Sequence, residues 1–72
     1  MTKHIAVSSS DLSSIAYDKD TSLLEVRFKA GGTYRYGNVP EATFNALLHA
    51  PSKGTFFYAV IRDKFPTEKV GK

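Results

Sequence analysis

The chain has 72 residues, ten Lys or Arg, seven Asp or Glu and no cysteine, with a net charge of +3 and a pI of about 9.3. This length allows one small domain with a thin core, and the lack of cysteine excludes disulfides, thiolate catalysis and thiolate metal ligands. Because no apolar run approaches a membrane span and no signal peptide is visible, we expect a cytoplasmic protein without membrane contact. The mild positive charge permits nucleic-acid binding without requiring it.

The first half of the chain predicts strands. Residues 1–3 are expected to be loose, and His4–Val7 has the weak apolar pattern of an edge strand before a polar break. Ser13–Asp18 and Leu23–Phe28 alternate between apolar and polar side chains, which is typical of half-buried antiparallel strands. A four-residue turn between them is expected to place Ile15 opposite Leu24 and to keep the apolar side chains on one face.

The turn around Gly31–Gly32 decides which face the following tyrosines occupy. A three-residue loop over Ala30–Gly32 would place Tyr34 opposite Phe28 and put both tyrosines on the apolar face, with the neighbouring arginines on the open face. A two-residue turn would instead bury Arg35 and expose the tyrosines. Because an unpaired buried arginine is costly, we favour the three-residue loop.

The second half predicts two helices. Val39-Pro40-Glu41 favours a helix start with proline at the first helical position, and the helix is expected to end before Pro51. Ser52 is expected to cap a second helix over Lys53–Ile61, and Gly54 in its first turn suggests that another segment approaches closely there. Residues 67–72 are expected to fray.

The predicted fold is therefore α+β, with an antiparallel meander of three strands, an additional N-terminal edge strand, and two C-terminal helices packed on one face. The whole chain is expected to form one domain with an ordered core over residues 7–65. The predicted core residues are Ile15, Leu24, Val26, Phe28, Tyr34, Val39, Phe44, Leu47, Leu48, Phe57 and Ile61.

The main candidate site is the set of interleaved aromatic and basic residues Arg27, Lys29, Tyr34, Arg35 and Tyr36. Aromatic rings on a sheet can stack bases while neighbouring cations contact phosphates. The competing interpretation makes the tyrosines core residues and the arginines a solvated face, and an intermediate one buries the rings with their hydroxyls at the rim. A second basic patch could form from Lys53, Arg62 and Lys64, with an ordinary solvated helix face as the alternative.

No pattern predicts catalysis, a cofactor or a metal site. His4 and His49 lack metal-ligand spacing, and a catalytic Ser-His-acid set is recognised by geometry, which the sequence does not specify. We therefore do not expect an enzyme.

The order and spacing of several short motifs resemble the KTSC domain family, over about residues 7–65. The matching motifs are Val7-x-Ser9-Ser10, Ile15-Ala16-Tyr17-Asp18, Leu24-Glu25-Val26-x-Phe28, Gly31-Gly32, Tyr34-Arg35-Tyr36, Val39-Pro40, Ala50-x-Ser52-x-Gly54 and Ile61-Arg62. The tyrosine-x-tyrosine pair is the hallmark of the family. The chain departs from the family pattern at Tyr58, where a polar residue such as asparagine is usual, and at Ala16, which replaces a commoner glycine.

The resemblance also suggests a function. The family is named for its occurrence at the C-terminus of some lysyl-tRNA synthetases, and it also occurs as a small free-standing bacterial protein. The occurrence beside a synthetase implies a module that binds RNA weakly, with tRNA as one candidate. We expect the chain to be a monomer. The alternative is a protein-interaction module without catalytic activity, which could accept a partner strand at a free sheet edge.

Overall fold

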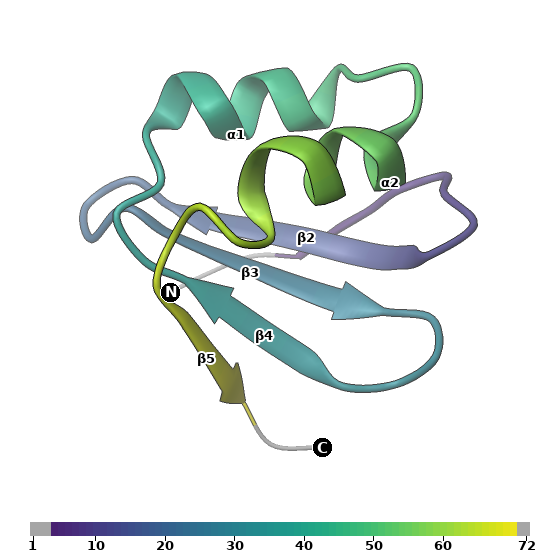
Figure 1. The fold of residues 1–72 in the computed structure, drawn as a ribbon, viewed down its shortest axis with the longest axis horizontal. Coiled ribbons are helices and arrows are strands. Elements are labelled where there is room, and N and C mark those ends of the chain that lie inside the picture. The colour runs from purple at the N-terminus through teal and green to yellow at the C-terminus, as the bar shows by residue number, and fades with distance from the viewer. Residues whose placement is uncertain (1–3, 71–72) are drawn as a thin grey trace.

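A computed structural model describes residues 4–70 as one antiparallel sheet with helices covering one face (Figure 1). The five strands lie side by side in chain order. They are β1 (Ile5–Ala6), β2 (Leu12–Asp18), β3 (Leu23–Phe28), β4 (Thr33–Tyr36) and β5 (Thr67–Val70). The α+β class is confirmed, and the sheet is larger than the predicted meander. No helix in the described part of the chain is long and apolar enough to cross a membrane.

The pairing of β2 with β3 differs from the prediction by two residues. Ile15 lies opposite Val26 rather than Leu24, because the four turn residues 19–22 leave Asp18 paired directly with Leu23. A shift of two residues preserves the face of every side chain, so the predicted apolar face is retained.

A bulge at Ser13 places one additional residue in the core. Leu12 pairs with Phe28 while Ser14 pairs with Arg27, which leaves Ser13 as the extra residue on β2. Simple alternation would have put Leu12 on the open face with Ser14. The bulge turns it to the apolar face, where it is fully buried.

The turn between β3 and β4 has the predicted length. It spans Lys29–Gly31, one residue earlier than predicted, and the Gly31 N–H donates a hydrogen bond to the Phe28 carbonyl at 3.0 Å. Gly31 has a φ of 110°, which favours glycine at this position. Tyr34 consequently pairs with Val26 rather than with Phe28. The pairing again differs from the prediction by two residues, which leaves the face of each side chain unchanged. The prediction that both tyrosines lie on the apolar face is therefore confirmed.

The C-terminal segment is not frayed as predicted. β5 forms the outer strand beside β4, with Thr67 opposite Tyr36 and Val70 opposite Thr33. The first three residues of β5 are exposed and polar, so the segment carried no apolar pattern that would indicate a strand. The expectation for residues 1–3, and that for residues 71–72, lie outside the described part of the chain.

The helical layer begins with α1 (Glu41–Leu48). Pro40 occupies the N-cap position rather than the predicted first helical position, and its carbonyl accepts a hydrogen bond from the Phe44 N–H at 3.2 Å. The next helix starts with α2 (Lys53–Phe56), and the predicted cap is confirmed because Ser52 Oγ accepts from the Thr55 N–H at 3.4 Å.

The second helix continues without a break as the π-helical turn η1 (Phe57–Ile61). The Arg62 N–H donates to the Phe57 carbonyl at 2.9 Å, five residues back, which defines the wider winding. Such turns are rare in proteins and occur frequently at functional sites. The close approach predicted at Gly54 is also confirmed, since a Cβ there would lie 3.3 Å from Asp11 Oδ2.

The core fills the space between the sheet and these helices. Its buried members are Leu12, Ile15, Leu24, Val26, Tyr36, Val39, Phe44, Leu47, Phe57 and Ile61. The predicted core members Phe28, Tyr34 and Leu48 are only partly buried and pack against this cluster. Leu12 and Tyr36 belong to this cluster and were missing from the prediction.

Candidate functional site

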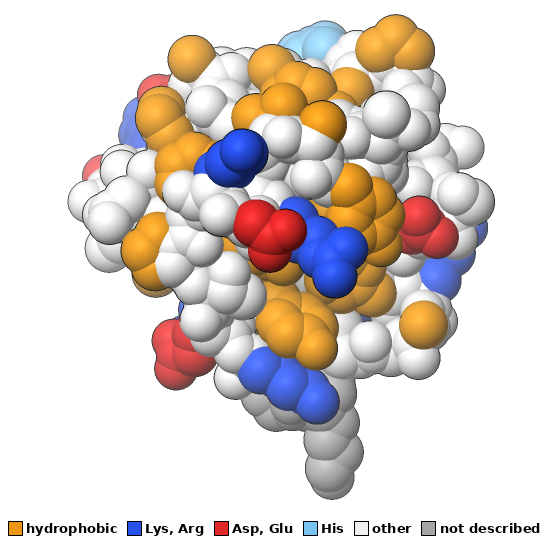
Figure 2. All heavy atoms as spheres, in the orientation of Figure 1, with side chains coloured by type: hydrophobic (Ala, Val, Ile, Leu, Met, Phe, Trp, Pro, Cys, Tyr) orange, Lys and Arg blue, Asp and Glu red, His pale blue; other side chains and the backbone are white. Residues whose placement is uncertain are grey.

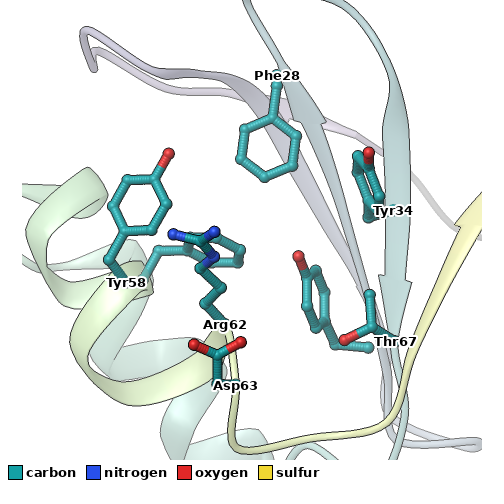
Figure 3. Close-up of a pocket in the computed structure, with 8 residues that line it drawn as sticks. Phe28, Tyr34, Tyr58, Arg62, Asp63 and Thr67 are labelled. Atoms are coloured by element: carbon teal, nitrogen blue, oxygen red, sulfur yellow. The ribbon is translucent and has the colours of Figure 1, made fainter.

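An open hollow of about 430 Å³ lies along the seam between η1 and the strands β3 and β4 (Figure 3). We call it the aromatic hollow. Its lining residues are Phe28, Tyr34, Tyr36, Phe57, Tyr58, Arg62, Asp63 and Thr67. Figure 2 shows cationic side chains and an adjacent acidic one, surrounded by hydrophobic side chains, in the middle of the visible face over this seam.

Phe57 anchors the hollow to the core. It is 1% exposed, and its ring makes edge-to-face contacts with Phe28 at 5.5 Å and with Tyr36 at 5.3 Å between ring centroids. Phe28 makes a further edge contact with Tyr34 at 5.6 Å. Because these rings are packed against one another from three elements, the wall of the hollow is held in one arrangement.

The Tyr36 phenol stays protonated over the whole physiological pH range. Burial, with a smaller contribution from the neighbouring Tyr34, raises its pKa to about 12. Tyr36 lines the hollow although it is only 3% exposed, and its hydroxyl makes no hydrogen bond within residues 4–70. It is therefore available to donate a hydrogen bond to a ligand.

The cationic side chain of Arg62 lines the helical side of the hollow. The Arg62 guanidinium lies over the ring of Tyr58, with 5.3 Å between its carbon and the ring centroid. Both side chains are exposed, and both come from the end of the helix where η1 is wound. Asp63 and Thr67 add a carboxylate and a hydroxyl to the rim in Figure 3. The hollow thus combines flat rings, phenolic donors and one guanidinium.

The structure separates the residues of the main predicted site. Tyr34 and Tyr36 face the helices, while Arg27 and Arg35 lie on the opposite, open face of the sheet. Successive side chains of a strand point to opposite faces, so β4 cannot present its tyrosines and Arg35 to one ligand. Lys29 lies in the turn after β3 and is exposed. A single surface that unites all five predicted residues is therefore not formed.

Arg35 belongs instead to a polar network on the open face. Its Nε donates to Glu25 Oε1 at 3.1 Å, and Glu25 Oε2 lies 2.5 Å from His4 Nε2. The other ring nitrogen of His4 is hydrogen-bonded to Ser14 Oγ at 2.8 Å. Since His4 directly precedes β1, the network holds the first strand against β2 and β3.

Ser14, His4 and Glu25 are the residue types of a catalytic triad, but they lack the substrate access that a triad needs. Ser14 is 7% exposed, and none of the three residues lines the aromatic hollow. A triad nucleophile needs access to substrate and donors for the oxyanion. The grouping is therefore explained by its packing role.

We expect Glu25→Gln to destabilise the protein by about 1–2 kcal/mol at neutral pH, because charge-assisted hydrogen bonds are lost. The hydrogen bond from His4, followed by that from Arg35, lowers the pKa of Glu25 below the ordinary 4.5 despite the opposing effect of burial. Because the pKa of Glu25 is lower in the folded than in the unfolded protein, its ionisation stabilises the folded state above pH 4.5. This stabilisation is lost as the pH falls through the pKa of Glu25 in the folded state.

Denaturant unfolding of both proteins from neutral to acid pH measures the effect of Glu25→Gln. The difference in free energy of unfolding should shrink below pH 4.5. A difference that is the same at every pH would show that the carboxylate charge plays no part in holding β1.

The second predicted patch is also divided. Arg62 lines the aromatic hollow, whereas Lys53 is half-buried and its Nζ donates to the Ala50 carbonyl at 3.2 Å. Lys53 lines a separate polar hollow together with Lys29. Lys64 is exposed and lines neither hollow. The useful groupings, Arg62 with the tyrosines and Lys53 with Lys29, depend on long-range packing that the sequence did not indicate.

The remaining histidine, His49, lies at the C-terminal end of α1. His49 Nδ1 lies 2.9 Å from the Asn45 carbonyl at the end of α1. Within residues 4–70, no group of three or more His, Asp or Glu side chains could hold a metal ion.

Comparison with known proteins places the fold and its sequence in one family. The model of the KTSC domain matches residues 8–65. The crystal structure of a KTSC domain protein from Yersinia pestis is 44% identical, covers 99% of this chain and 100% of its own, and superposes with a TM-score of 0.97. An uncharacterized protein of Stutzerimonas stutzeri is 43% identical over 60 residues, which cover 83% of this chain and 84% of that protein.

Part of a larger protein is similar as well. A lysine–tRNA ligase of Trichormus variabilis is 37% identical over 54 residues, which cover 75% of this chain but 10% of the ligase. A lysine–tRNA ligase of Nostoc punctiforme gives a similar match, with 36% identity over 55 residues. The chain therefore corresponds to about a tenth of each ligase.

Proposed function

The chain belongs to the KTSC domain family, and from this premise we propose that it is a binding module without catalytic activity that binds single-stranded RNA weakly in the aromatic hollow. The hollow replaces the open sheet face as the proposed site. The one observation that carries the proposal is the convergence of three tyrosines, Tyr34, Tyr36 and Tyr58, with Arg62 around one open hollow.

The residues of the hollow match the chemistry of an unstacked nucleotide. Base stacking on an aromatic side chain contributes about 1–3 kcal/mol, and Tyr58 is exposed enough to offer its ring. Arg62 can contact a phosphate with two parallel hydrogen bonds, and the phenols supply neutral donors beside it. One base and one phosphate contact give weak binding, consistent with a module that works together with other contacts.

The similarity to lysine–tRNA ligases supports RNA as the ligand class. Those relatives are named for an activity on tRNA, and this domain accounts for a small share of their length. A module attached to such an enzyme is well placed to contact its RNA substrate. We therefore propose tRNA, with its unpaired loops and end, as the first natural RNA to test.

We expect Arg62→Gln to weaken binding of a short single-stranded RNA about tenfold, and to lower the slope of log affinity against log salt by about one. The matched control is Arg27→Gln, which removes the same charge from the open face of the sheet. Fluorescence anisotropy across a salt series measures both variants. The control should bind as tightly as the wild type.

Two outcomes would reject this proposal. If Arg27→Gln weakens binding while Arg62→Gln does not, the RNA lies on the open face. If the wild-type protein binds neither short RNA nor tRNA at low salt, the hollow is not a nucleic-acid site.

Protein interaction is the second candidate function. β5 is an outer strand of the sheet, and no strand in the described part of the chain pairs with its free edge. An extended peptide could add there through main-chain hydrogen bonds. Such binding would tolerate high salt, which distinguishes it from phosphate-dependent RNA binding.

A further inference from the structure

The aromatic hollow is one part of a longer groove. A second hollow shares Phe28, Tyr34 and Tyr58 with it and continues to the β3–β4 turn. A third hollow, which is lined by Ser8, Ser9, Ser10, Lys29, Pro51, Ser52 and Lys53, shares Ser10 and Lys29 with the second. The three hollows therefore adjoin in a row along the seam between the helices and the sheet. We call this row the seam groove.

Positive charge is concentrated at the two ends of the seam groove. Arg62 lines the aromatic hollow at one end and Lys53 lines the polar hollow at the other, while Lys29 lies where the polar hollow joins the middle one. Lys53 donates one hydrogen bond to the Ala50 carbonyl, so its ammonium group is held at this end with two further donors available. The rings of Phe28, Tyr34 and Tyr58 lie between the two ends.

Two carboxylates moderate this charge. Asp63 lines the aromatic hollow and Asp11 the middle one. Each carboxylate repels a phosphate placed next to it, but it can accept a hydrogen bond from a ribose hydroxyl. The arrangement is therefore a patterned site with cations at its ends, and it differs from a uniform cationic stripe that would hold any polyanion.

Building on the proposed RNA-binding function, we propose that the seam groove binds an RNA segment containing two backbone phosphates on either side of a stacked base. One phosphate is bound by Arg62, the base lies against the aromatic rings, and the other phosphate is bound by Lys29 and Lys53. The charge pattern of the groove, cation–aromatic–cation, complements the phosphate–base–phosphate pattern of single-stranded RNA. The smallest ligand with this pattern is a nucleoside 3′,5′-bisphosphate.

The test compares adenosine 3′,5′-bisphosphate with adenosine 5′-monophosphate and adenosine 3′-monophosphate by amide NMR titration at low salt. The bisphosphate should bind at least tenfold more tightly than either monophosphate. Lys29→Gln and Lys53→Gln should each remove most of this advantage and leave the monophosphate bound at Arg62 unaffected. Lys19→Gln, which removes a charge from the opposite turn of the sheet, is the matched control and should change nothing.

The outcomes separate this inference from the proposed function. Equal affinity for the bisphosphate and the monophosphates, with RNA binding still dependent on Arg62, overturns the seam groove and retains the aromatic hollow. Loss of affinity in the Lys19→Gln control to the same extent as in Lys29→Gln also overturns it, because the effect is then one of net charge. Failure of every nucleotide and RNA to bind rejects both proposals.

Discussion

Val26→Asp should leave the protein unfolded under conditions in which the wild type is folded. Val26 is fully buried in the middle strand of the sheet, between Ile15 and Tyr34 on the neighbouring strands. A carboxylate there would lose its hydration without gaining a partner, which costs several kcal/mol. Proteins of this length have only about 4–11 kcal/mol of stability in total. Circular dichroism with thermal unfolding measures the change.

Arg27→Asp is the matched control for this prediction. It introduces the same side chain at the next position, where the residue is exposed on the open face. This variant should fold and unfold cooperatively with a melting temperature close to that of the wild type. A folded Val26→Asp protein, or an unfolded Arg27→Asp protein, would contradict the assignment of the two faces of the sheet.

Phe57→Ala should cost about 3–5 kcal/mol, the usual loss for removing a buried phenylalanine. Phe57 is the aromatic residue through which the second helix contacts the rings of Phe28 and Tyr36. Its loss would leave a cavity beneath the aromatic hollow. Denaturant unfolding should show a much lower midpoint, with the same dependence on denaturant concentration if the variant still unfolds in one step.

The flanking aromatic residues provide the comparison for Phe57→Ala. Tyr58 is 44% exposed, so Tyr58→Ala should cost less than about 1 kcal/mol, and half-buried Phe56 should give an intermediate loss. If Tyr58→Ala proves as destabilising as Phe57→Ala, the helix is rotated relative to the sheet and the described hollow is not formed.

The faces of the central strands could be predicted because alternation is a local property of the sequence. The pairing of Ile15 with Val26, and of Tyr34 with Val26, was missed by two residues because the turn positions were each misplaced. Since a two-residue error leaves every face unchanged, the face of the tyrosines was still predicted correctly. An error of one residue would have reversed it.

Features that depend on tertiary packing could not be predicted in this way. Leu12 reaches the core through a bulge, which breaks the alternation by which strand faces are assigned. β5 consists mostly of exposed polar residues and is held by pairing with β4, so its own sequence gave no strand signal. The π-helical winding of η1 likewise has no simple sequence pattern.

Single residues of the candidate site were predicted from the sequence, but their grouping around one hollow was not. Tyr34 and Tyr36 were identified as aromatic candidates and Arg62 as a cationic one, but they were assigned to different surfaces. The hollow that unites them forms between β4 and η1, which are more than twenty residues apart in the chain. Tyr58 was noticed only as a departure from the family pattern, and the structure shows its ring beneath the Arg62 guanidinium.

The most direct test of the RNA-binding hollow is a backbone amide NMR titration with a short single-stranded RNA and with tRNA, at low and then at physiological salt. We predict that the amides of Tyr34, Tyr36, Tyr58 and Arg62 shift together, saturate, and recover as salt rises. Shifts confined to the open face around Arg27 and Arg35, or no shifts even at low salt, would contradict it.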